Sequence, residues 1–304
     1  MAAYLARRLI GSVLILIGVS FITFFLLYVL PADPVRQIAG RSATPETVES
    51  IRQHLGLDQS FIVQYGRYLG ALVQGDLGRS YLQRTEVAEL IWSRLPATLL
   101  LMVAAIFCEL LIGLTLGVTA ALYRGRPLDQ VLMVSSFVAV SAPQFVVSLL
   151  LLYVFAVKLG WFPIGGYGTF AHLVLPALTL GMLGSGWYSR MMRSSMIDVL
   201  HADFIRTARA KGLSESSILL KHALKNAFLP VLSYLGPALA LAMTGSFVVE
   251  RVFNVPGMGQ HFVNAVLNKD LFLIMGVVLI YATLLIVFNI AVDVLYRWVD
   301  PRIE

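Results

Sequence analysis

The chain has 304 residues, of which 58% are hydrophobic and only 13% are charged, and its formal net charge is +6. Soluble globular domains carry roughly a quarter charged residues, so this composition excludes a water-soluble domain and indicates an integral membrane protein. No basic run is interleaved with stacking aromatic residues, which argues against nucleic-acid binding. The single cysteine, Cys108, excludes an intrachain disulfide.

Six segments are long and apolar enough to cross a bilayer, which takes about 20 residues. The first follows Arg7 and Arg8, is too long for a secretion signal and lacks a cleavage pattern, so we expect an uncleaved anchor. The predicted spans cover residues 9–30, 97–123, 131–157, 172–192, 227–249 and 271–296. The predicted organisation is an N-terminal anchor (1–30), an extracytoplasmic segment with short helices (31–96) and a core of five spans (97–304).

Positive charge is unevenly distributed between the two sides of these spans. Arginine and lysine gather at both termini and in the second and fourth loops, whereas the short outer loops hold only Lys158, Arg251 and Lys269. Cytoplasmic loops carry such an excess, so both termini are expected in the cytoplasm. Segments as long as residues 31–96 cross the membrane largely regardless of charge.

The loop between the fourth and fifth spans reads DFIRTARAKGLSESSILLKHALKNAFLP and is the most basic of the cytoplasmic loops. We expect Asp203 to cap a first short helix and Gly212 to end it in the left-handed conformation. Ser214 would cap a second helix that runs to about Lys225. Apolar faces are expected at Phe204, Ile205 and Ala208 and at Leu213, Leu220 and Leu224. Such a loop could simply lie on anionic lipid, but its caps and central glycine favour a defined docking patch.

This loop resembles the EAA-type loop of ABC importer permeases, in the branch that handles oligopeptides, dipeptides, nickel and glutathione. The resemblance rests on RTARAKGLS followed by LLKHALKNAFLP, and extends over almost the whole chain through ARRL, LPADP, GDLGRSY, RLPATLLL, SAPQF and VVERVFNVPGMGQ. The glutamate and the Ile-x-Leu-Pro ending typical of sugar permeases are absent, which makes a sugar cargo less favoured. Two positions differ from this branch. Ala32 stands where glycine is commoner, and Leu271 and Phe272 stand where the branch has an aromatic residue together with a proline.

The resemblance implies an all-α type I ABC importer permease fold with six spans, in the bacterial inner membrane. Its implied partners are a second homologous permease subunit, two ATPase subunits, an extracytoplasmic substrate-binding protein and membrane lipid. ATP and magnesium would bind the ATPase subunits, with no cofactor or metal on this chain. The residues implied to couple to the ATPase are Thr207, Ala208, Arg209, Ala210, Lys211, Gly212, Leu213, Ser214, Glu215, Leu220, Lys221 and His222.

Other classes of protein fit the sequence less well. No lysine lies in the Gly-Lys-Ser/Thr order of a phosphate-binding loop, and no histidine begins a His-Glu-x-x-His zinc motif. An intramembrane serine enzyme would require Ser185, which lies among glycines but lacks the Gly-x-Ser-Gly order. A secondary transporter would require a relay around Glu109, the one deep acidic residue, but no inverted repeat accompanies it. Close helix packing is the simpler interpretation of Ser185, and likewise of Gly113-x-x-x-Gly117.

A translocation path is predicted where polar or helix-breaking residues interrupt the apolar spans, because freed backbone groups are tolerated where they line a cavity. Each of these residues also has an ordinary packing interpretation. They are Ser141, Pro143, Gln144, Ser185, Ser189, Gly236, Pro237 and Ser246. An outer gate is predicted in the loop 250–270, with charges at both ends, at Glu250, Pro256, Gly257 and Gly259. The expected cargo is a short peptide, with a nickel chelate, glutathione or another solute as the alternative.

Overall fold

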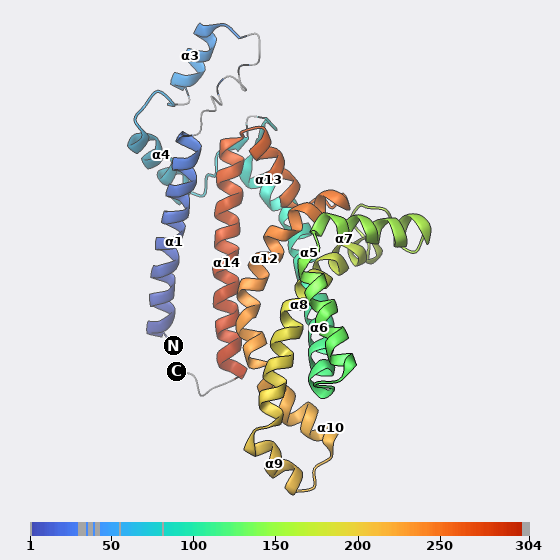
Figure 1. Ribbon diagram of the computed structural model, residues 1–304. Helices are drawn as coiled ribbons and strands as arrows, with labels where there is room; N and C mark the ends of the chain where they lie inside the picture. The colour runs from blue at the N-terminus through green and yellow to red at the C-terminus, as the bar shows by residue number, and fades with distance from the viewer. Residues whose placement is uncertain are drawn as a thin grey trace. The chain divides into compact units, whose positions relative to one another are not determined.

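The computed structural model describes residues 2–29, 35, 39, 43–54, 56–80 and 82–299, which are mostly helical (Figure 1). The LPADP motif, which begins at Leu30 at the end of the first predicted span, and Tyr81 lie outside the described residues. The chain forms two compact units: Met1–Pro96 with Gln260–Ile286, and Ala97–Gly259 with Val287–Glu304.

The first unit contains the N-terminal anchor and the predicted extracytoplasmic segment. Its elements are α1 (Ala2–Val29), α3 (Pro45–His54), α4 (Phe61–Val73), the antiparallel pair β1 (Arg79–Ser80) and β2 (Thr85–Glu86), the start of α5 (Val87–Leu122), most of α13 (Met258–Leu267) and the first part of α14 (Leu271–Val299). The short helices expected between residues 31 and 96 are therefore present as α3 and α4.

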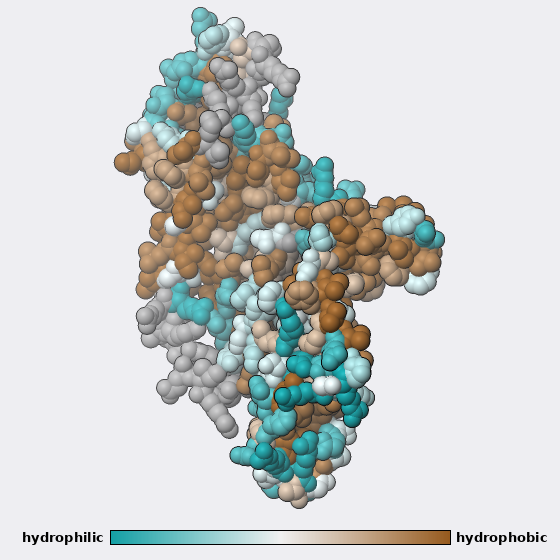
Figure 2. Space-filling view, in the orientation of Figure 1, coloured by the Kyte–Doolittle hydropathy of each residue, from teal (hydrophilic) through white to brown (hydrophobic). Residues whose placement is uncertain are grey.

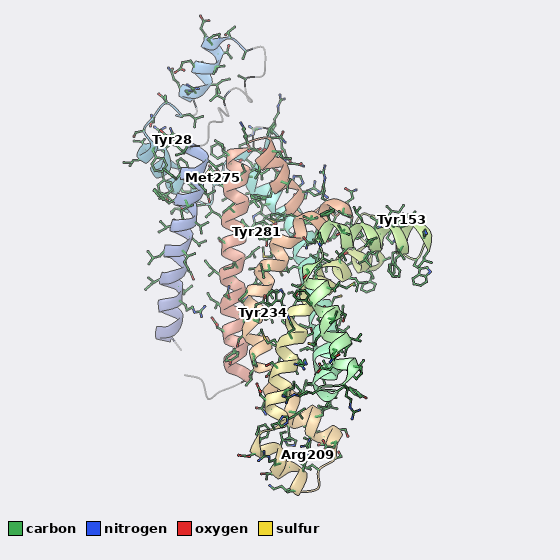
Figure 3. The ribbon with its side chains drawn as sticks, viewed as in Figure 1. Tyr28, Tyr153, Arg209, Tyr234, Met275 and Tyr281 are labelled. Carbon is green, nitrogen blue, oxygen red and sulfur yellow. The ribbon has the colours of Figure 1, made fainter. Side chains whose placement is uncertain are left out.

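Aromatic side chains join α4 to the end of α1. The rings of Phe61 and Tyr28 lie 5.1 Å apart edge to face, and Phe24 stacks on Tyr68 at 5.6 Å. Such pairs contribute about 0.5–1.5 kcal/mol beyond their buried area. Tyr68 also packs against Met275 of α14 (Figure 3). The apolar residues of α4 thus fix this helix on the anchor.

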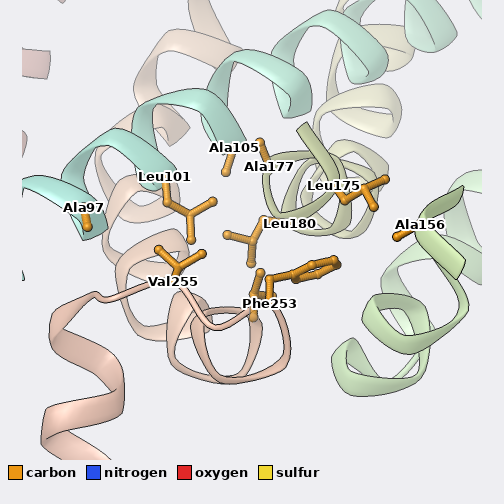
Figure 4. Packing of buried hydrophobic residues seen from close by; sticks show 10 residues of the cluster. Ala97, Leu101, Ala105, Ala156, Leu175, Ala177, Leu180, Phe253 and Val255 are labelled. Carbon is orange, nitrogen blue, oxygen red and sulfur yellow. The ribbon is translucent and has the colours of Figure 1, made fainter. Parts of the chain in front are cut away.

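The second unit contains most of the predicted core. It holds the rest of α5, α6 (Pro127–Ser141), α7 (Gln144–Leu151) with its π-helical continuation η1 (Leu152–Lys158), α8 (Phe170–Leu200), α9 (Asp203–Ala210), α10 (Glu215–Ser217), the π-helical η2 (Ile218–Ala223), α11 (Leu224–Ala227), α12 (Leu229–Val252) and the end of α14. Its hydrophobic centre joins α5, α8, η1 and the end of α12 (Figure 4). The buried members are Ala97, Leu101, Ala105, Ala156, Leu175, Ala177, Leu180, Val249, Phe253 and Val255.

Five helices within the described residues are long and apolar enough to span a membrane, and a sixth candidate is a bent pair. The third predicted span, residues 131–157, corresponds to this pair, in which α6 and α7 meet at 105° at the predicted proline break. Ala142 has an extended ψ of 133°, as expected for a residue before proline, and Pro143 lacks a backbone N–H. The arm formed by α7 and η1 exposes mostly apolar side chains, and Figure 2 shows it as a hydrophobic projection.

Glycines bring α5 and α8 into close contact. A Cβ added to Gly113 would lie 2.8 Å from the Ser185 carbonyl oxygen, and one added to Gly117 would lie 2.6 Å from that of Ser189. Only glycine permits this backbone approach. The packing role predicted for the two glycines of α5 is confirmed.

Candidate functional site

The loop after α8 is the most distinctive polar region of the second unit. Its first helix, α9, begins at Asp203, but Ala202 occupies the N-cap position and makes no side-chain cap bond. The prediction that Asp203 is the cap is therefore wrong. Asp203 instead lies in the first turn, where its carboxylate favours the positive end of the helix and its Oδ1 accepts from Arg206 at 3.3 Å.

The turn between the two helices has the predicted conformation. Gly212 has a φ of +76°, which disfavours residues with a side chain, and a Cβ there would meet nothing within 4 Å. Its N–H donates to the Arg209 carbonyl oxygen at 2.9 Å. Ser214 caps the second helix, because its Oγ accepts from the Ser217 N–H at 3.4 Å. The expected roles of Gly212 and Ser214 in the backbone are confirmed.

The second helix is longer and packed differently from the prediction. It runs through α10, η2 and α11 as far as Ala227. Its buried residues are Ile218, Ala223 and Ala227, whereas Leu220 is 63% exposed. The wider π-helical turns of η2 shift the side chains away from an α-helical register, so Leu220 of the predicted apolar face lies apart from the buried residues of this helix.

An ion pair links the two helices on either side of Gly212. Arg209 donates from Nε and Nη2 to the Glu215 carboxylate at 2.8 and 3.2 Å. This hydrogen bond lowers the pKa of Glu215 and raises that of Arg209. Sequence reasoning missed the pair, because a spacing of six residues is not a neighbour distance on one helix. The left-handed turn at Gly212 creates it.

The loop presents a mixed cationic and apolar outer surface. Figure 2 shows hydrophilic residues gathered over α9 and α10, and Figure 3 marks Arg209 there. Ala208 is buried and His222 is half-buried. The other predicted coupling residues are exposed: Thr207, Arg209, Ala210, Lys211, Gly212, Leu213, Ser214, Glu215, Leu220 and Lys221.

The predicted outer gate is organised around a buried carboxylate. Glu250 belongs to the end of α12 and not to the loop where it was predicted, and it is fully buried. Its Oε1 accepts from Thr98 Oγ1 at 2.8 Å and from Ser246 Oγ at 3.0 Å, and its Oε2 accepts from the Gly259 N–H at 2.8 Å. A Cβ on Gly257 would lie 2.3 Å from the carboxyl carbon. The glycines of VPGMG therefore make room for this carboxylate.

The other end of the predicted gate loop is also buried. Asp270 lies just before α14 in the first unit, and its Oδ2 accepts from Ser80 Oγ at 2.5 Å. Its Oδ1 also accepts from the Leu273 N–H at 3.4 Å, as in a helix cap. Both acidic residues therefore shape the backbone instead of charging an exposed loop. Pro256, between them, is half-buried.

The predicted path residues fall into two groups. Ser141 and Pro143 are exposed at the bend between α6 and α7, Gln144 there is half-buried, and Pro237 is exposed on α12. The buried group hydrogen-bonds or packs within the chain: Ser185 to the Met182 carbonyl, Ser189 to Ser136, Ser246 to Glu250, and Gly236 against Asn289. Their part in a translocation path stays a prediction.

Glu109 is buried on α5 against Gly184 of α8. Only 6% of it is exposed, and Gly184 of α8 leaves the space for its carboxylate, since a Cβ there would lie 2.1 Å from the carboxyl carbon.

Among the described residues, no group of three or more histidines, cysteines or acidic residues could hold a metal ion.

Long apolar helices, a defined polar loop at the end of one of them and close glycine packing define a polytopic membrane protein. A family model described as binding-protein-dependent transport system inner membrane component matches residues 113–304. A second, described as the N-terminal part of such a membrane component, matches residues 1–102. The chain belongs to the family of binding-protein-dependent transport system inner membrane components.

Known proteins resemble the chain over its full length. It is 40% identical, over 100% of this chain and 99% of each relative, to the glutathione transport system permease protein GsiC of Salmonella paratyphi A and to that of Escherichia coli K12. A solved structure of the MetNI methionine ABC transporter in inward-facing conformations matches at a TM-score of 0.58 and 20% identity. The match covers 69% of this chain and 96% of that chain, and it supports the same fold.

The predicted class of protein, an ABC importer permease, is therefore confirmed in preference to the two alternatives, an enzyme and a secondary transporter. The chain is a multi-pass inner-membrane permease subunit of an ABC importer, with the type I permease fold. It is a transporter subunit and not an enzyme. Permeases of this class work with ATPase and substrate-binding protein partners.

Proposed function

We propose that this chain pairs with a second homologous permease subunit and two ATPase subunits to import short peptides. ATP and magnesium bind the ATPase subunits, and a substrate-binding protein delivers the cargo from outside. The cytoplasmic loop carries the proposal: the Gly212 turn and the Ser214 cap give it a set shape, and the Arg209–Glu215 pair links its two helices. ATP-driven closure of the ATPase subunits would move this loop as a rigid body and alternate the access of the path.

The outer surface of the loop supports contact with a protein partner. Phe204, Leu213 and Leu220 are 45%, 41% and 63% exposed, although all three are large and apolar. Exposed apolar residues rimmed by charges are typical of protein interfaces, and Lys211 and Lys221 supply such charges here. A loop that only lies on lipid does not require the fixed turn at Gly212.

Glutathione is the second candidate cargo. The relatives that carry the name glutathione permease match this chain at 40% identity over its whole length. Glutathione is itself a short peptide, so both candidates require a path for a flexible, charged solute of similar size.

The test uses the chain expressed with its neighbouring transport genes and reconstituted in vesicles with ATP and the binding protein. Leu220→Asp is expected to abolish ATPase co-purification and uptake, because it places a carboxylate in an apolar contact. Leu267→Asp is the matched control, since Leu267 on α13 is a 73% exposed leucine outside the loop. Dipeptides, tripeptides, glutathione and a nickel chelate are offered as cargo in turn. Full ATPase binding by Leu220→Asp would contradict the coupling role, and uptake of none of the peptides would contradict the cargo.

A further inference from the structure

A second ion pair, absent from the sequence-based predictions, joins α6 to α8. Arg193 donates from Nε to Asp129 Oδ1 at 2.6 Å and from Nη2 to Oδ2 at 2.7 Å. The Gly125 N–H donates to the same Oδ2 at 3.0 Å. The Asp129 side chain is only 5% exposed, unlike the open pair in the cytoplasmic loop. A two-pronged contact of this kind fixes both distance and orientation.

The same two helices are also joined further along. Ser189 Oγ donates to Ser136 Oγ at 2.7 Å. Gly186 packs directly on α6, since a Cβ there would lie 2.3 Å from the Ser136 carbonyl oxygen. The pair of Asp129 and Arg193 adds a second polar contact near the start of α6, so polar side chains join the two helices at two separate points.

Helix α8 leads directly into the cytoplasmic loop. It ends at Leu200, and only His201 and Ala202 separate it from α9. This link is ordered, because the Ala202 N–H donates to the Val199 carbonyl at 3.0 Å and the Ile205 N–H donates to Ala202 at 3.1 Å. The second helix of the loop packs back on α8 through η2 and α11. Displacement of the loop therefore moves the end of α8.

We infer that Asp129 and Arg193 are positioning residues that make α6 move together with α8, so that a displacement of the loop reaches the bend at Ala142 and Pro143. Packed helices transmit motion when their contacts leave a single arrangement. The pair fixes that arrangement at the α6 end farthest from the bend. This inference rests on the proposed function, in which an ATPase moves the loop.

The first experiment measures uptake per ATP hydrolysed by the reconstituted transporter. Arg193→Gln and Asp129→Asn are each expected to lower this ratio by about tenfold, the size of a typical coupling between sites. The double variant should be no worse than either single variant, since both remove one interaction. Arg126→Gln, which removes an exposed cation just before α6, is the control and should leave the ratio unchanged. A purely structural role would lower uptake and ATP hydrolysis together, so an unchanged ratio in both single variants would overturn the inference.

The second experiment uses the isolated full chain and does not depend on partners. Spin labels are placed at the exposed residues Gln130 and His201 after Cys108→Ala removes the native thiol. The distance distribution is expected to be narrow in the parent and broad in Arg193→Gln. If Arg193→Gln fails to insert into the membrane, Arg193→Lys takes its place, because lysine keeps the charge but not the two-pronged contact. An equally narrow distribution in the variant overturns the inference, whereas failure of any ATPase to co-purify contradicts only the proposed function.

Discussion

The cytoplasmic loop and the turn after α12 are two polar regions of the same unit, held by opposite means. In the loop the ion pair of Arg209 and Glu215 is open to solvent, and the fixed element is the backbone at Gly212. In the turn a fully buried carboxylate, Glu250, collects hydrogen bonds from Thr98, Ser246 and Gly259. The first region is shaped by its chain conformation and the second by a side chain at its centre.

The difference is consistent with the proposed docking of the loop on a partner protein. A loop that docks on another protein must expose its side chains, so its shape has to come from caps and turns. A turn surrounded by apolar packing has no water to satisfy its polar groups, so each of them requires an internal partner. Substitutions should therefore unfold the turn, whereas in the loop they should disconnect transport from ATP hydrolysis.

The largest effect is expected at the buried carboxylate. Glu250→Ala removes the acceptor of the Thr98 hydroxyl and of the Gly259 N–H, and each such buried group costs about 1–3 kcal/mol. We expect a clear loss of thermal stability of the detergent-solubilised chain. The stability of Glu250→Gln should lie between those of the parent and Glu250→Ala, because its amide keeps one acceptor oxygen. Arg251→Ala, at the exposed neighbouring position, is the control. Equal melting temperatures for Glu250→Ala and Arg251→Ala would remove the distinction between the two regions.

The second effect concerns function more than stability. Gly212→Val forces a β-branched residue into a left-handed conformation, which costs about 1–2 kcal/mol. We expect lost uptake and lost substrate-stimulated ATPase activity with normal membrane insertion, since a Cβ at this position would meet nothing within 4 Å. Asparagine tolerates this conformation, so Gly212→Asn should keep most of the uptake. Full uptake by the valine variant would show that the turn is not what shapes the loop.

The loop turn was predictable from the sequence, because each of its signals is local. Gly212 and Ser214 act on a few neighbouring residues, and the apolar runs similarly reveal the spans. The bend at Pro143 had a local signal as well, but an apolar run on either side of a proline does not distinguish a kink from a break. Contacts between distant segments had no such signal. Thr98 and Glu250 are 152 residues apart, and Asp129 and Arg193 are 64 apart.

Glu250 illustrates why burial was misjudged. An acidic residue after an apolar span reads as the start of an exposed loop, because burying a charge is costly unless hydrogen bonds compensate. Compensation here depends on Thr98 of another helix and on two glycines that follow in the turn. Only the folded structure brings these groups together.

The smallest effect is expected at the exposed pair, and it tests whether the backbone alone shapes the loop. Exposed ion pairs contribute little, so Glu215→Gln should change uptake at neutral pH by less than about twofold. Arg209 lowers the pKa of Glu215, so any stabilisation by the pair is fully present above the ordinary glutamate pKa. It is lost as the pH falls through the lowered value.

Hydrogen exchange of the amides between Arg209 and Glu215 can follow this loss, after correction for the intrinsic pH dependence of exchange. In the parent, the protection of these amides from exchange should fall only when the pH is below the ordinary pKa of glutamate. In Glu215→Gln, the protection should not depend on pH in that range. The exposed pair of Asp203 and Arg206 provides a comparison within the same loop, through Asp203→Asn. If Glu215→Gln instead abolishes uptake as Gly212→Val is expected to do, the carboxylate itself takes part in docking. The loop and the turn would then both depend on a single acidic side chain, and exposure alone would separate them.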